Sequence, residues 1–422
     1  MFVLNIINYT LLGLFGLLYL YQFIFTIVAL VKRPPKLTGE APLKKYAIMV
    51  CGRNEGNVIG DLINCIKNQT YPYDHLKIFV MADNCTDNTA QVARDAGAVV
   101  YERNNQQVIG KSYALEELLG HIKEEYPDEF DGFFVFDADN ILKTDYIEKM
   151  HLTLAAGNDM ATSYRNSKNY GSSWVTAAHG LWFLRESRYL NEARYTMGCS
   201  CAISGTGYVF KKEVLDEFEG NWPFHFMTED VQFSVYRVLH GKKIGYCAEA
   251  EFYDEQPLTL RQSCIQRKRW AKGNLQVFWH YKKELIKGFF KGNFSCYDML
   301  LAAIPAFILT ALSMLCAIVS CIVNLCTHPS VMGALFSIIM TIGSLYGGAF
   351  AMGLVALITE WDRIAAKNYQ KIMYLFSFPL FMLTYLPLVF IAMFSKASWE
   401  PIPHTESVQQ LKEKGAMHVK DY

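Results

Sequence analysis

The sequence predicts an α/β domain with a mostly parallel sheet, inserted between apolar segments that are long enough to span a membrane. Hydrophobic residues make up 52% of the 422-residue chain and concentrate before residue 32 and after residue 296. The middle section has an ordinary globular composition and alternates predicted strands with predicted helices. One predicted strand, Gly132–Phe136, runs directly into two carboxylates, Asp137 and Asp139.

The composition excludes some classes of function. The chain carries 40 basic and 40 acidic residues, a balance that is unlike a nucleic-acid-binding protein, and its apolar excess is too high for an ordinary soluble enzyme. The 11 cysteines are scattered, and only Cys199 and Cys201 lie close together. We therefore expect buried, reduced thiols rather than disulfides or a metal site.

The first 33 residues predict an N-terminal membrane anchor. Leu11–Val31 is long enough to cross a bilayer and carries no charge. A signal peptide is the alternative, but the stretch has neither a basic leading region nor a small-residue cleavage site. By the positive-inside rule the middle domain is cytoplasmic, because a basic cluster follows the anchor: Lys32, Arg33, Lys36, Lys44 and Lys45.

Residues 44–254 form the predicted α/β domain. The predicted strands are Tyr46–Val50, Lys77–Ala82, Ala98–Tyr101 and Gly132–Phe136, and the predicted helices are Glu55–Asn68, Asn88–Ala96 and Ser112–Glu125. Polar clusters follow three of the strands at residues 53–55, 83–87 and 137–139. We expect these clusters to line one edge of the sheet, where ligands bind in open α/β folds.

The C-terminal part returns to the membrane. Residues 255–296 mix aromatic with basic residues, which predicts amphipathic helices on the membrane surface; a solvated basic helix, or one that resembles a calmodulin target, is the alternative. Met299–Val323 and Val331–Thr359 predict two spans within a membrane region covering 297–394, joined by an outside loop that lacks Lys and Arg. The basic loop Trp361–Lys371 is then inside.

The last apolar segment leaves the side of the tail, residues 395–422, open. Ile372–Phe394 is long enough to span but contains Pro379 and Pro387. A single crossing places the tail outside, whereas a re-entrant hairpin broken at the prolines keeps it inside.

The two carboxylates after Gly132–Phe136 suggest a metal site. Residues at i and i+2 project to the same side, so Asp137 and Asp139 can face one ligand. Hard oxygen ligands suit Mg²⁺ or Mn²⁺ carrying a diphosphate. The alternative is that Asp137 and Asn140 only cap the following helix.

Four motifs in order carry a resemblance to a known family. They are Asp137-Ala138-Asp139, Gly205-Thr206-Gly207, Thr228-Glu229-Asp230 and Gln266-Arg267-Lys268-Arg269-Trp270. With the flanking apolar segments, this set resembles the family 2 processive glycosyltransferases, which include cellulose, hyaluronan, chitin and poly-N-acetylglucosamine synthases. The resemblance covers nearly the whole chain. It implies a GT-A-like nucleotide-sugar-binding domain in an integral membrane protein.

The resemblance also implies catalytic roles. Asp139 and Asp137 hold the metal, Asp230 is the base that deprotonates the acceptor hydroxyl, and Glu229 orients the site. A single base opposite the leaving group predicts inversion, and hence a β-linked product from an α-linked donor. Taken alone, Asp230 at the start of a predicted helix, Val231–Leu239, also fits a plain N-cap.

The Gln-x-x-Arg-Trp motif places Gln266, Arg269 and Trp270 on one helical face. Arg269 can pair with diphosphate oxygens, and Trp270 can stack against the acceptor sugar. Arg267 and Lys268 are expected to meet lipid headgroups instead. An amphipathic surface helix whose cations reach the headgroups is the alternative.

The earlier motifs supply the donor site by resemblance. Glu55, Asp83 and Asp87 correspond to residues that contact uridine, and Lys111 to one that reaches a phosphate. Where many relatives read Pro-Ala before the Arg-Asn-Glu cluster, this chain has Cys51 and Gly52. Asp83–Asp87 also fits a turn built from Asx side chains, and Lys111 alone fits a solvated lysine.

Gly205 and Thr206 are expected to bring the backbone close to the acceptor sugar, although a tight turn explains the glycines equally well. The tail segment Trp399–His404 resembles an element of a bacterial subset of these enzymes. No chemistry follows from it, and we expect either a clamp over the acceptor channel or a structural latch.

The leading expectation is a metal-dependent transferase that adds GlcNAc or glucose from a UDP-sugar to a growing polysaccharide or oligosaccharide acceptor, coupled to translocation and with a membrane or export partner. One alternative is a non-processive enzyme that puts a single sugar on a lipid, against which the Gln-x-x-Arg-Trp motif argues. Another is a nucleotide-regulated transporter or channel.

Overall fold

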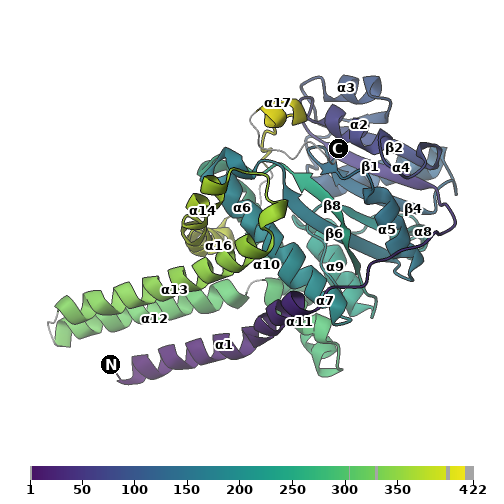
Figure 1. Cartoon of the computed structure of the whole chain (residues 1–422). Coiled ribbons are helices and arrows are strands. Elements are labelled where there is room, and N and C mark those ends of the chain that lie inside the picture. Colours follow the sequence, from purple (N-terminus) through teal and green to yellow (C-terminus); the bar gives the residue numbers. More distant parts are fainter. Residues whose placement is uncertain (1, 304, 328–330, 396–399, 414–422) are drawn as a thin grey trace.

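A computed structural model describes residues 2–303, 305–327, 331–395 and 400–413. An α/β domain forms the bulk of the molecule, and three long helices, α1, α12 and α13, extend away from it in the same direction (Figure 1). Helix α1 covers Phe2–Val31, α12 covers Pro305–Thr327, and α13 covers Val331–Thr359.

The domain is built on an eight-stranded sheet in the order β3-β2-β1-β4-β7-β6-β8-β5. Strands β3, β2, β1 and β4 are parallel, whereas β7 pairs antiparallel with both β4 and β6. The mostly parallel sheet predicted from the sequence is therefore confirmed for its first half, and the second half is mixed. The strands are β1 Tyr46–Gly52, β2 Leu76–Asp83, β3 Val99–Arg103, β4 Gly132–Asp137, β5 Ile141–Leu142, β6 Met160–Ser167, β7 Tyr208–Lys211 and β8 Gly245–Asp254.

Helices cover the sheet, and the four that the sequence predicts within the domain are present among them. Helix α2 begins at Ile59, four residues later than predicted, because the turn before it is held by other contacts: the Glu55 backbone N–H donates to the Thr89 hydroxyl at 2.8 Å. The helices of the domain are α2 Ile59–Lys67, α3 Thr89–Asp95, α4 Lys111–Glu125, α5 Tyr146–Ala155, α6 Trp174–Arg185, α7 Glu192–Thr196, α8 Lys212–Asp216 and α9 Glu229–Leu239. A π-helical turn, Glu186–Asn191, joins α6 to α7.

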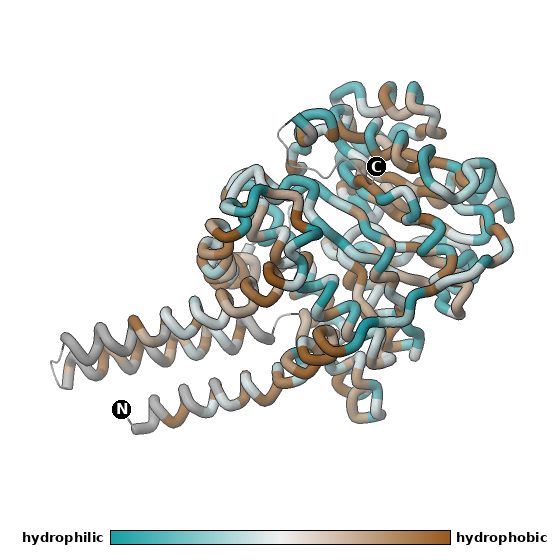
Figure 2. The backbone as a smooth tube through the Cα atoms, in the orientation of Figure 1, coloured by the Kyte–Doolittle hydropathy of each residue, from teal (hydrophilic) through white to brown (hydrophobic). Residues whose placement is uncertain are grey.

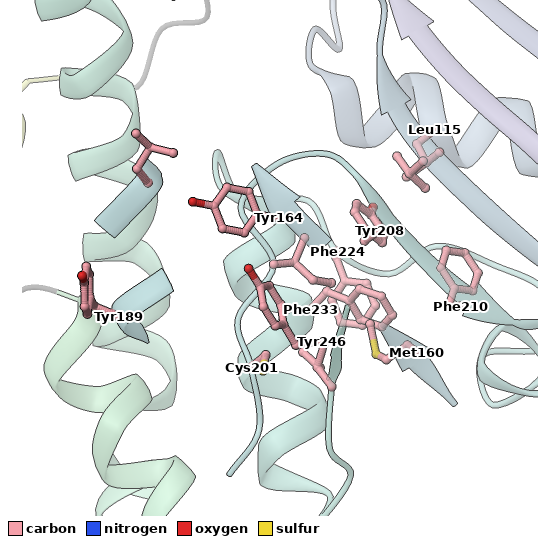
Figure 3. Packing of buried hydrophobic residues seen from close by; sticks show 14 of the residues in the cluster. Leu115, Met160, Tyr164, Tyr189, Cys201, Tyr208, Phe210, Phe224, Phe233 and Tyr246 are labelled. Carbon is pink, nitrogen blue, oxygen red and sulfur yellow. The ribbon is translucent and has the colours of Figure 1, made fainter. Parts of the chain in front are cut away.

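Aromatic side chains fill the core beneath the second half of the sheet (Figure 3). Phe210 of β7 lies 6.0 Å from Phe233 of α9, and Phe233 lies 4.8 Å from Phe224, measured between ring centroids. All three are essentially buried. This packing fixes α9, and with it the start of α9, against the sheet.

Among the residues that the structure describes, two helices are long and apolar enough to cross a membrane, over Gly13–Val31 and Ile342–Thr359. The part of α1 next to the domain is mainly hydrophobic (Figure 2). Over the predicted span Met299–Val323 the structure describes α11 (Phe294–Ala303) and α12 from Pro305 onward, and Ile304 between them lies outside the described residues.

The last apolar segment is broken, as its prolines suggested. It forms α14 Asn368–Leu375, α15 Phe378–Leu383 and α16 Tyr385–Phe394, with a bend of 42° after α14. After α16 the chain comes back to the α/β domain and ends in α17, Val408–Glu413 (Figure 1). The Val408 N–H donates to Asp61 at 2.9 Å, and Leu411 is fully buried. The described tail therefore packs on the same side as the α/β domain.

Arg188 ties α1 and α13 to the domain. Its guanidinium donates to the Ala29 carbonyl of α1 at 2.5 Å, pairs with Glu192, and lies 3.4 Å from Glu360 just after α13. All of these charged side chains are buried. Because a buried ion pair that loses one partner is costly, this cluster fixes how the long helices meet the domain.

Candidate active site

The polar clusters predicted to share one edge of the sheet do so. In the parallel register Cys51 of β1 is opposite Asp137 of β4, and Gly52 is opposite Ala82 of β2. The chain leaves all three strands at the same edge. A helix of 31 residues, α10 (Leu260–Phe290), carries the Gln-x-x-Arg-Trp motif.

Asp137 faces a lysine rather than capping a helix. The residues after it lead into β5, and α5 starts only at Tyr146, so the capping alternative is not realised. The Asp137 carboxylate pairs with Lys111 Nζ, which also donates to the Gly205 carbonyl at 2.8 Å. Burial alone would lower the pKa of Lys111, but the carboxylates of Asp137 and Glu229 outweigh it and raise the pKa above its usual value.

Asp139 is buried and held from several sides. Its Oδ2 accepts the Glu255 backbone N–H at 2.6 Å, and its Oδ1 accepts from Asn140 at 3.2 Å. Burial acts to raise the pKa of Asp139, but the charges of His404 and Lys168 oppose it and hold this pKa below its usual range. Asp139 is therefore an anion inside the domain.

The tail brings a histidine into this site, which the sequence did not reveal. His404 Nδ1 lies 2.9 and 3.0 Å from the two carboxylate oxygens of Glu55. Burial disfavours the charged imidazole, yet Asp139 and Glu55 outweigh burial and raise the pKa of His404 to about 10. Next to it, the Thr405 N–H donates to Glu255 at 2.9 Å. Trp399, which begins the tail element, lies outside the described residues.

Glu229 and Asp230 form the first turn of α9, and both are buried. Thr228 occupies the N-cap position, so Asp230 is not the cap that the alternative required. Burial raises the pKa of both carboxyl groups, and the Asp230 charge raises that of Glu229 further, while Lys111 opposes both shifts. Buried carboxylates with raised pKa values are the environment that a general base needs.

The Gln-x-x-Arg-Trp motif divides between two faces of α10. Gln266, Arg269 and Trp270 border one cavity together, as their spacing predicted. Burial lowers the pKa of Arg269, and Glu229, Asp137 and Asp230 are the charged groups that oppose this shift. Gln266 Oε1 is buried and has no hydrogen-bond partner among the described residues.

Arg267 does not lie where lipid headgroups would reach it, and this prediction is wrong. It is fully buried, donates to the Phe381 carbonyl at 3.1 Å and to the Thr384 hydroxyl at 2.8 Å, and stacks over the Phe381 ring at 4.1 Å. These contacts satisfy the carbonyl end of α15 where the helix is interrupted. Arg267 is a structural residue.

The Gly-Thr-Gly turn supports the carboxylates. Gly205 and Gly207 have φ values of +80° and +66°, and a Cβ on Gly207 would meet the Phe252 ring at 2.2 Å. The Thr206 hydroxyl accepts the Asp137 backbone N–H at 2.8 Å and donates to Asn140 at 2.6 Å. Gly205 borders the cavity, whereas the buried Thr206 holds the aspartate turn in place.

The predicted uridine-contacting residues differ in position. Glu55 borders the cavity, but Asp83 and Asp87 do not. Asp83 pairs with Arg103 at 2.7 Å, and Asp87 accepts from the Thr89 and Gly56 backbone N–H groups at 3.0 and 3.1 Å, as an Asx turn does. Their role in binding the nucleoside stays a prediction.

The residues present fit a divalent cation that takes some of its ligands from the substrate. Within the described part of the chain, no three His, Cys, Asp or Glu side chains form a ready-made metal site. Asp137 and Asp139 offer hard oxygen donors at the cavity. Mg²⁺ is commonly held by one or two carboxylates together with substrate phosphates, which is what these two aspartates can provide.

The cavity has a volume of about 960 Å³ and two chemically different ends. The carboxylates, Lys111, Arg269 and Gln266 border its polar end. Most of its remaining wall is apolar and comes from α1, α11, α13, α15 and α16, for example Phe15, Leu301, Met352 and Val389, although Gln22, Arg185, Glu186 and Arg194 also border it. A single space therefore joins the charged site to the apolar helices.

The chain is similar in sequence to several known proteins. The model for the family described as "Glycosyltransferase like family 2" matches residues 42–273. A β-monoglucosyldiacylglycerol synthase of Synechocystis is 27% identical over 257 residues, 59% of this chain and 52% of that protein. A synthase with the same name from Nostoc is 26% identical and covers 74% of this chain and 66% of that protein.

A poly-β-1,6-N-acetyl-D-glucosamine synthase of Staphylococcus epidermidis is 26% identical over 239 residues, 54% of either chain. This chain thus spans about half to two thirds of the length of these relatives. Among solved structures, the Pyrobaculum calidifontis mannosyltransferase PcManGT, in complex with GDP-Man and Mn²⁺, matches with a TM-score of 0.62 at 16% identity, over 93% of this chain and 99% of that one.

That structure supports the GT-A-like fold alone, whereas the family model covers more than half of the chain and includes all four of its motifs completely. The chain belongs to glycosyltransferase-like family 2.

Proposed function

We propose that the protein is an inverting glycosyltransferase that moves one sugar from a UDP-sugar to the hydroxyl group of a lipid. The observation that carries this proposal is the cavity that joins the catalytic carboxylates to apolar helix walls. A lipid can place its headgroup at the polar end and its chains along the apolar walls, because apolar surface favours contact with hydrocarbon over contact with water.

The donor occupies the polar end. Lys111, at the start of α4, and Arg269 bind diphosphate oxygens, to which cationic donors bond strongly. The backbone N–H groups at the beginning of α4 favour an anion for the same electrostatic reason. Glu55, Asp83 and Asp87 are the residues we assign to the nucleoside, and GlcNAc or glucose is the sugar. Asp137 and Asp139 hold Mg²⁺ or Mn²⁺, which when bound neutralises charge on the leaving diphosphate.

Asp230 is the catalytic base. It takes the proton of the acceptor hydroxyl while that oxygen forms a bond to the anomeric carbon of the sugar. The bond between the anomeric carbon and the diphosphate oxygen breaks, and the electron pair leaves with the nucleoside diphosphate. Attack from the face opposite the leaving group gives a β-linked product from an α-linked donor. Glu229 orients the site next to Asp230.

The acceptor headgroup meets Gln266 and Trp270. The unpartnered Gln266 Oε1 can accept a hydrogen bond from a hydroxyl group, and the ring of Trp270 offers an apolar face to a glycerol or sugar headgroup. Trp270 is held edge-on by His179 and Phe183, with ring centroids 5.9 and 6.0 Å away. An ordered aromatic side chain of this kind positions a substrate at low entropic cost.

A growing polysaccharide is the second candidate acceptor. The Gln-x-x-Arg-Trp motif, whose three residues share the cavity wall, favours it, and so does the match to a polysaccharide synthase. In either case we place the α/β domain on the cytoplasmic side of a membrane that α1, α13 and neighbouring helices enter. Processivity, translocation and an export partner belong to this second candidate.

A cavity-blocking variant tests the proposal. Ala351 lies on α13 and borders the apolar end, so Ala351→Trp fills the space intended for lipid chains. Ile358, on the same helix, is 64% exposed and does not border the cavity, so Ile358→Trp is the matched control. We expect Ala351→Trp to lower sugar transfer to lipid at least tenfold while UDP binding is unchanged, and Ile358→Trp to change neither. Equal transfer by both variants would contradict a lipid path through this cavity.

A further inference from the structure

Arg185 is one of the basic residues that border the cavity. It ends α6, and its guanidinium donates a hydrogen bond to Gln22 Oε1 of α1 at 2.7 Å, while the Trp182 ring lies 5.3 Å away. Arg185, Gln22 and Trp182 all border the cavity. A guanidinium has five N–H donors, and among the described residues this is its one hydrogen bond. Most of its donors therefore remain for a ligand.

The arginines that follow on the same stretch are neutralised, and Arg185 is not. Arg194 lies 2.6 Å from Asp298, and Arg188 pairs with Glu192. In the part of the chain that the structure describes, no carboxylate oxygen lies within 4.0 Å of the Arg185 guanidinium. Burial lowers the pKa of Arg185 to about 10, so the arginine is still charged at neutral pH. Enclosing a cation without an acid is costly unless an anion joins it.

This anion is not the donor diphosphate. The charged groups that face Arg269, at the polar end, are Glu229, Asp137 and Asp230. None of these is among the groups that act most strongly on Arg185, which include Glu186 on its own element and Arg194. Arg185 lies beside α1 through its hydrogen bond to Gln22, and it borders the cavity together with other basic residues such as Arg165 and Arg194.

The surroundings of Arg185 fit the junction of a lipid headgroup with its chains. Gln22 belongs to the part of α1 that packs on the domain, and Phe15 and Tyr19 of the same helix continue the cavity wall away from it. Asp230, Arg185 and these aromatic side chains of α1 all border the same cavity, so one ligand can contact all of them. A neutral diacylglycerol carries no charged group for that position.

We propose that Arg185 and Gln22 bind the phosphate of the acceptor, which is a phospholipid whose headgroup hydroxyl receives the sugar. The planar guanidinium matches two phosphate oxygens, which a lysine cannot reproduce. The inference rests on the proposed function, because it specifies which class of lipid enters the cavity.

The test compares two lipids with the same acyl chains in neutral detergent micelles: phosphatidylglycerol, which has a phosphate and free hydroxyls, and diacylglycerol, which has a hydroxyl only. The full-length wild-type protein is compared with Arg185→Gln, Arg185→Lys and the control Arg261→Gln. Arg261 is an exposed arginine at the start of α10 that does not border the cavity. Binding of each lipid is measured by displacement of a fluorescent lipid, and transfer is measured with labelled UDP-GlcNAc and UDP-glucose.

We expect Arg185→Gln to weaken phosphatidylglycerol binding about 10- to 100-fold, the usual range for a lost hydrogen bond to a charged group, and to leave diacylglycerol binding unchanged. Arg185→Lys falls in between, and Arg261→Gln behaves as wild type. An unchanged thermal unfolding temperature of Arg185→Gln verifies that the variant folds.

The outcomes separate this inference from the proposed function. If the protein transfers sugar to both lipids and Arg185→Gln does not change that transfer, the phosphate site is overturned and the lipid transferase stands. Phosphatidylglycerol binding that depends on Arg185, without transfer of sugar to any lipid, would keep the phosphate site and overturn the lipid transferase.

Discussion

At the scale of single residues, charge compensation distinguishes the catalytic groups from the structural ones. Asp83 and Arg103 are paired with each other, and Arg267 is fixed by the backbone of α15. Asp230 and Glu229 instead lie side by side at the start of α9, where two like charges are buried. Such an arrangement costs stability and is maintained where chemistry requires it.

Replacing the base separates chemistry from binding. We expect Asp230→Asn to lower kcat about 10²- to 10⁴-fold, because the amide cannot accept the acceptor proton. Nucleotide binding, measured by calorimetry with UDP, stays within twofold of wild type. Asp216→Asn, on the exposed end of α8, serves as the control and keeps full activity. A fully active Asp230→Asn would show that another group is the base.

The pH dependence follows from the same pair. Burial raises the pKa of Asp230, and the base works in its charged form, so kcat/KM falls as the pH decreases through this raised pKa, above the usual range for aspartate. Lys111 favours the charged forms of Asp230 and Glu229, so Lys111→Gln moves the acidic limb to higher pH in addition to lowering the rate. If the acidic limb of the pH–rate profile lies at the same pH in Lys111→Gln and in the wild type, Lys111 does not set the pKa values of Asp230 and Glu229.

The positions of site residues could be predicted where the spacing within a motif fixes which helical face its residues share. The spacing of Gln266, Arg269 and Trp270 placed them on one face of a helix, and the structure places all three at the cavity. The same spacing could not show that Arg267, on another face, would meet a break in a distant helix. His404 was out of reach for a related reason: it lies 349 positions from Glu55, and only the fold brings the two together.

At the scale of elements, α10 connects the active site to the apolar helices. One face of it carries Arg269 toward the catalytic carboxylates, and another carries Arg267 into the junction of α15 and α16. A displacement of α15 or α16 therefore reaches Arg269, to which we assign diphosphate binding, through a single helix. Neighbouring positions of the motif thus border the cavity and anchor the distant helices.

This architectural role can be measured. Arg267→Met keeps the length of the side chain but removes the guanidinium that donates to the Phe381 carbonyl and to the Thr384 hydroxyl, of which the carbonyl keeps the Thr384 hydroxyl as a donor at 2.6 Å, so we expect a loss of about 1–3 kcal/mol in the free energy of unfolding. Thermal unfolding in detergent, followed by fluorescence, reports it. Lys268→Met, one position along α10 and only partly buried, is the matched control. Equal unfolding temperatures for the two variants would argue against the contact.

Element boundaries were predictable where local signals dominate. The boundaries of the strands up to Asp137 and of the helix after Gly110 were predicted to within one or two residues of those observed, because apolar runs end at polar or glycine residues there. The antiparallel insertion of β7 had no local signal, because it depends on pairing across the sheet.

At the scale of the whole molecule, the proposed acceptor depends on which molecules the cavity can hold. The sequence favoured a growing polysaccharide over a lipid, on the strength of the Gln-x-x-Arg-Trp motif. That motif describes only the polar end, whereas the apolar walls are assembled from helices scattered over more than 370 residues, from Phe15 to Val389. No local sequence pattern could predict that the polar residues of the motif and these apolar side chains would line the same cavity. The cavity is our reason for ranking the lipid first.

The most direct test of this claim is the identity of the product made by the full-length wild-type protein. Purified protein in detergent receives labelled UDP-GlcNAc or UDP-glucose, Mg²⁺ or Mn²⁺, and a mixture of diacylglycerol and phosphatidylglycerol, and the product is extracted and analysed by mass spectrometry. We predict label in the organic phase, in a lipid that carries one β-linked sugar. Label in a water-soluble polymer that lengthens with time, with none in lipid, would contradict the account.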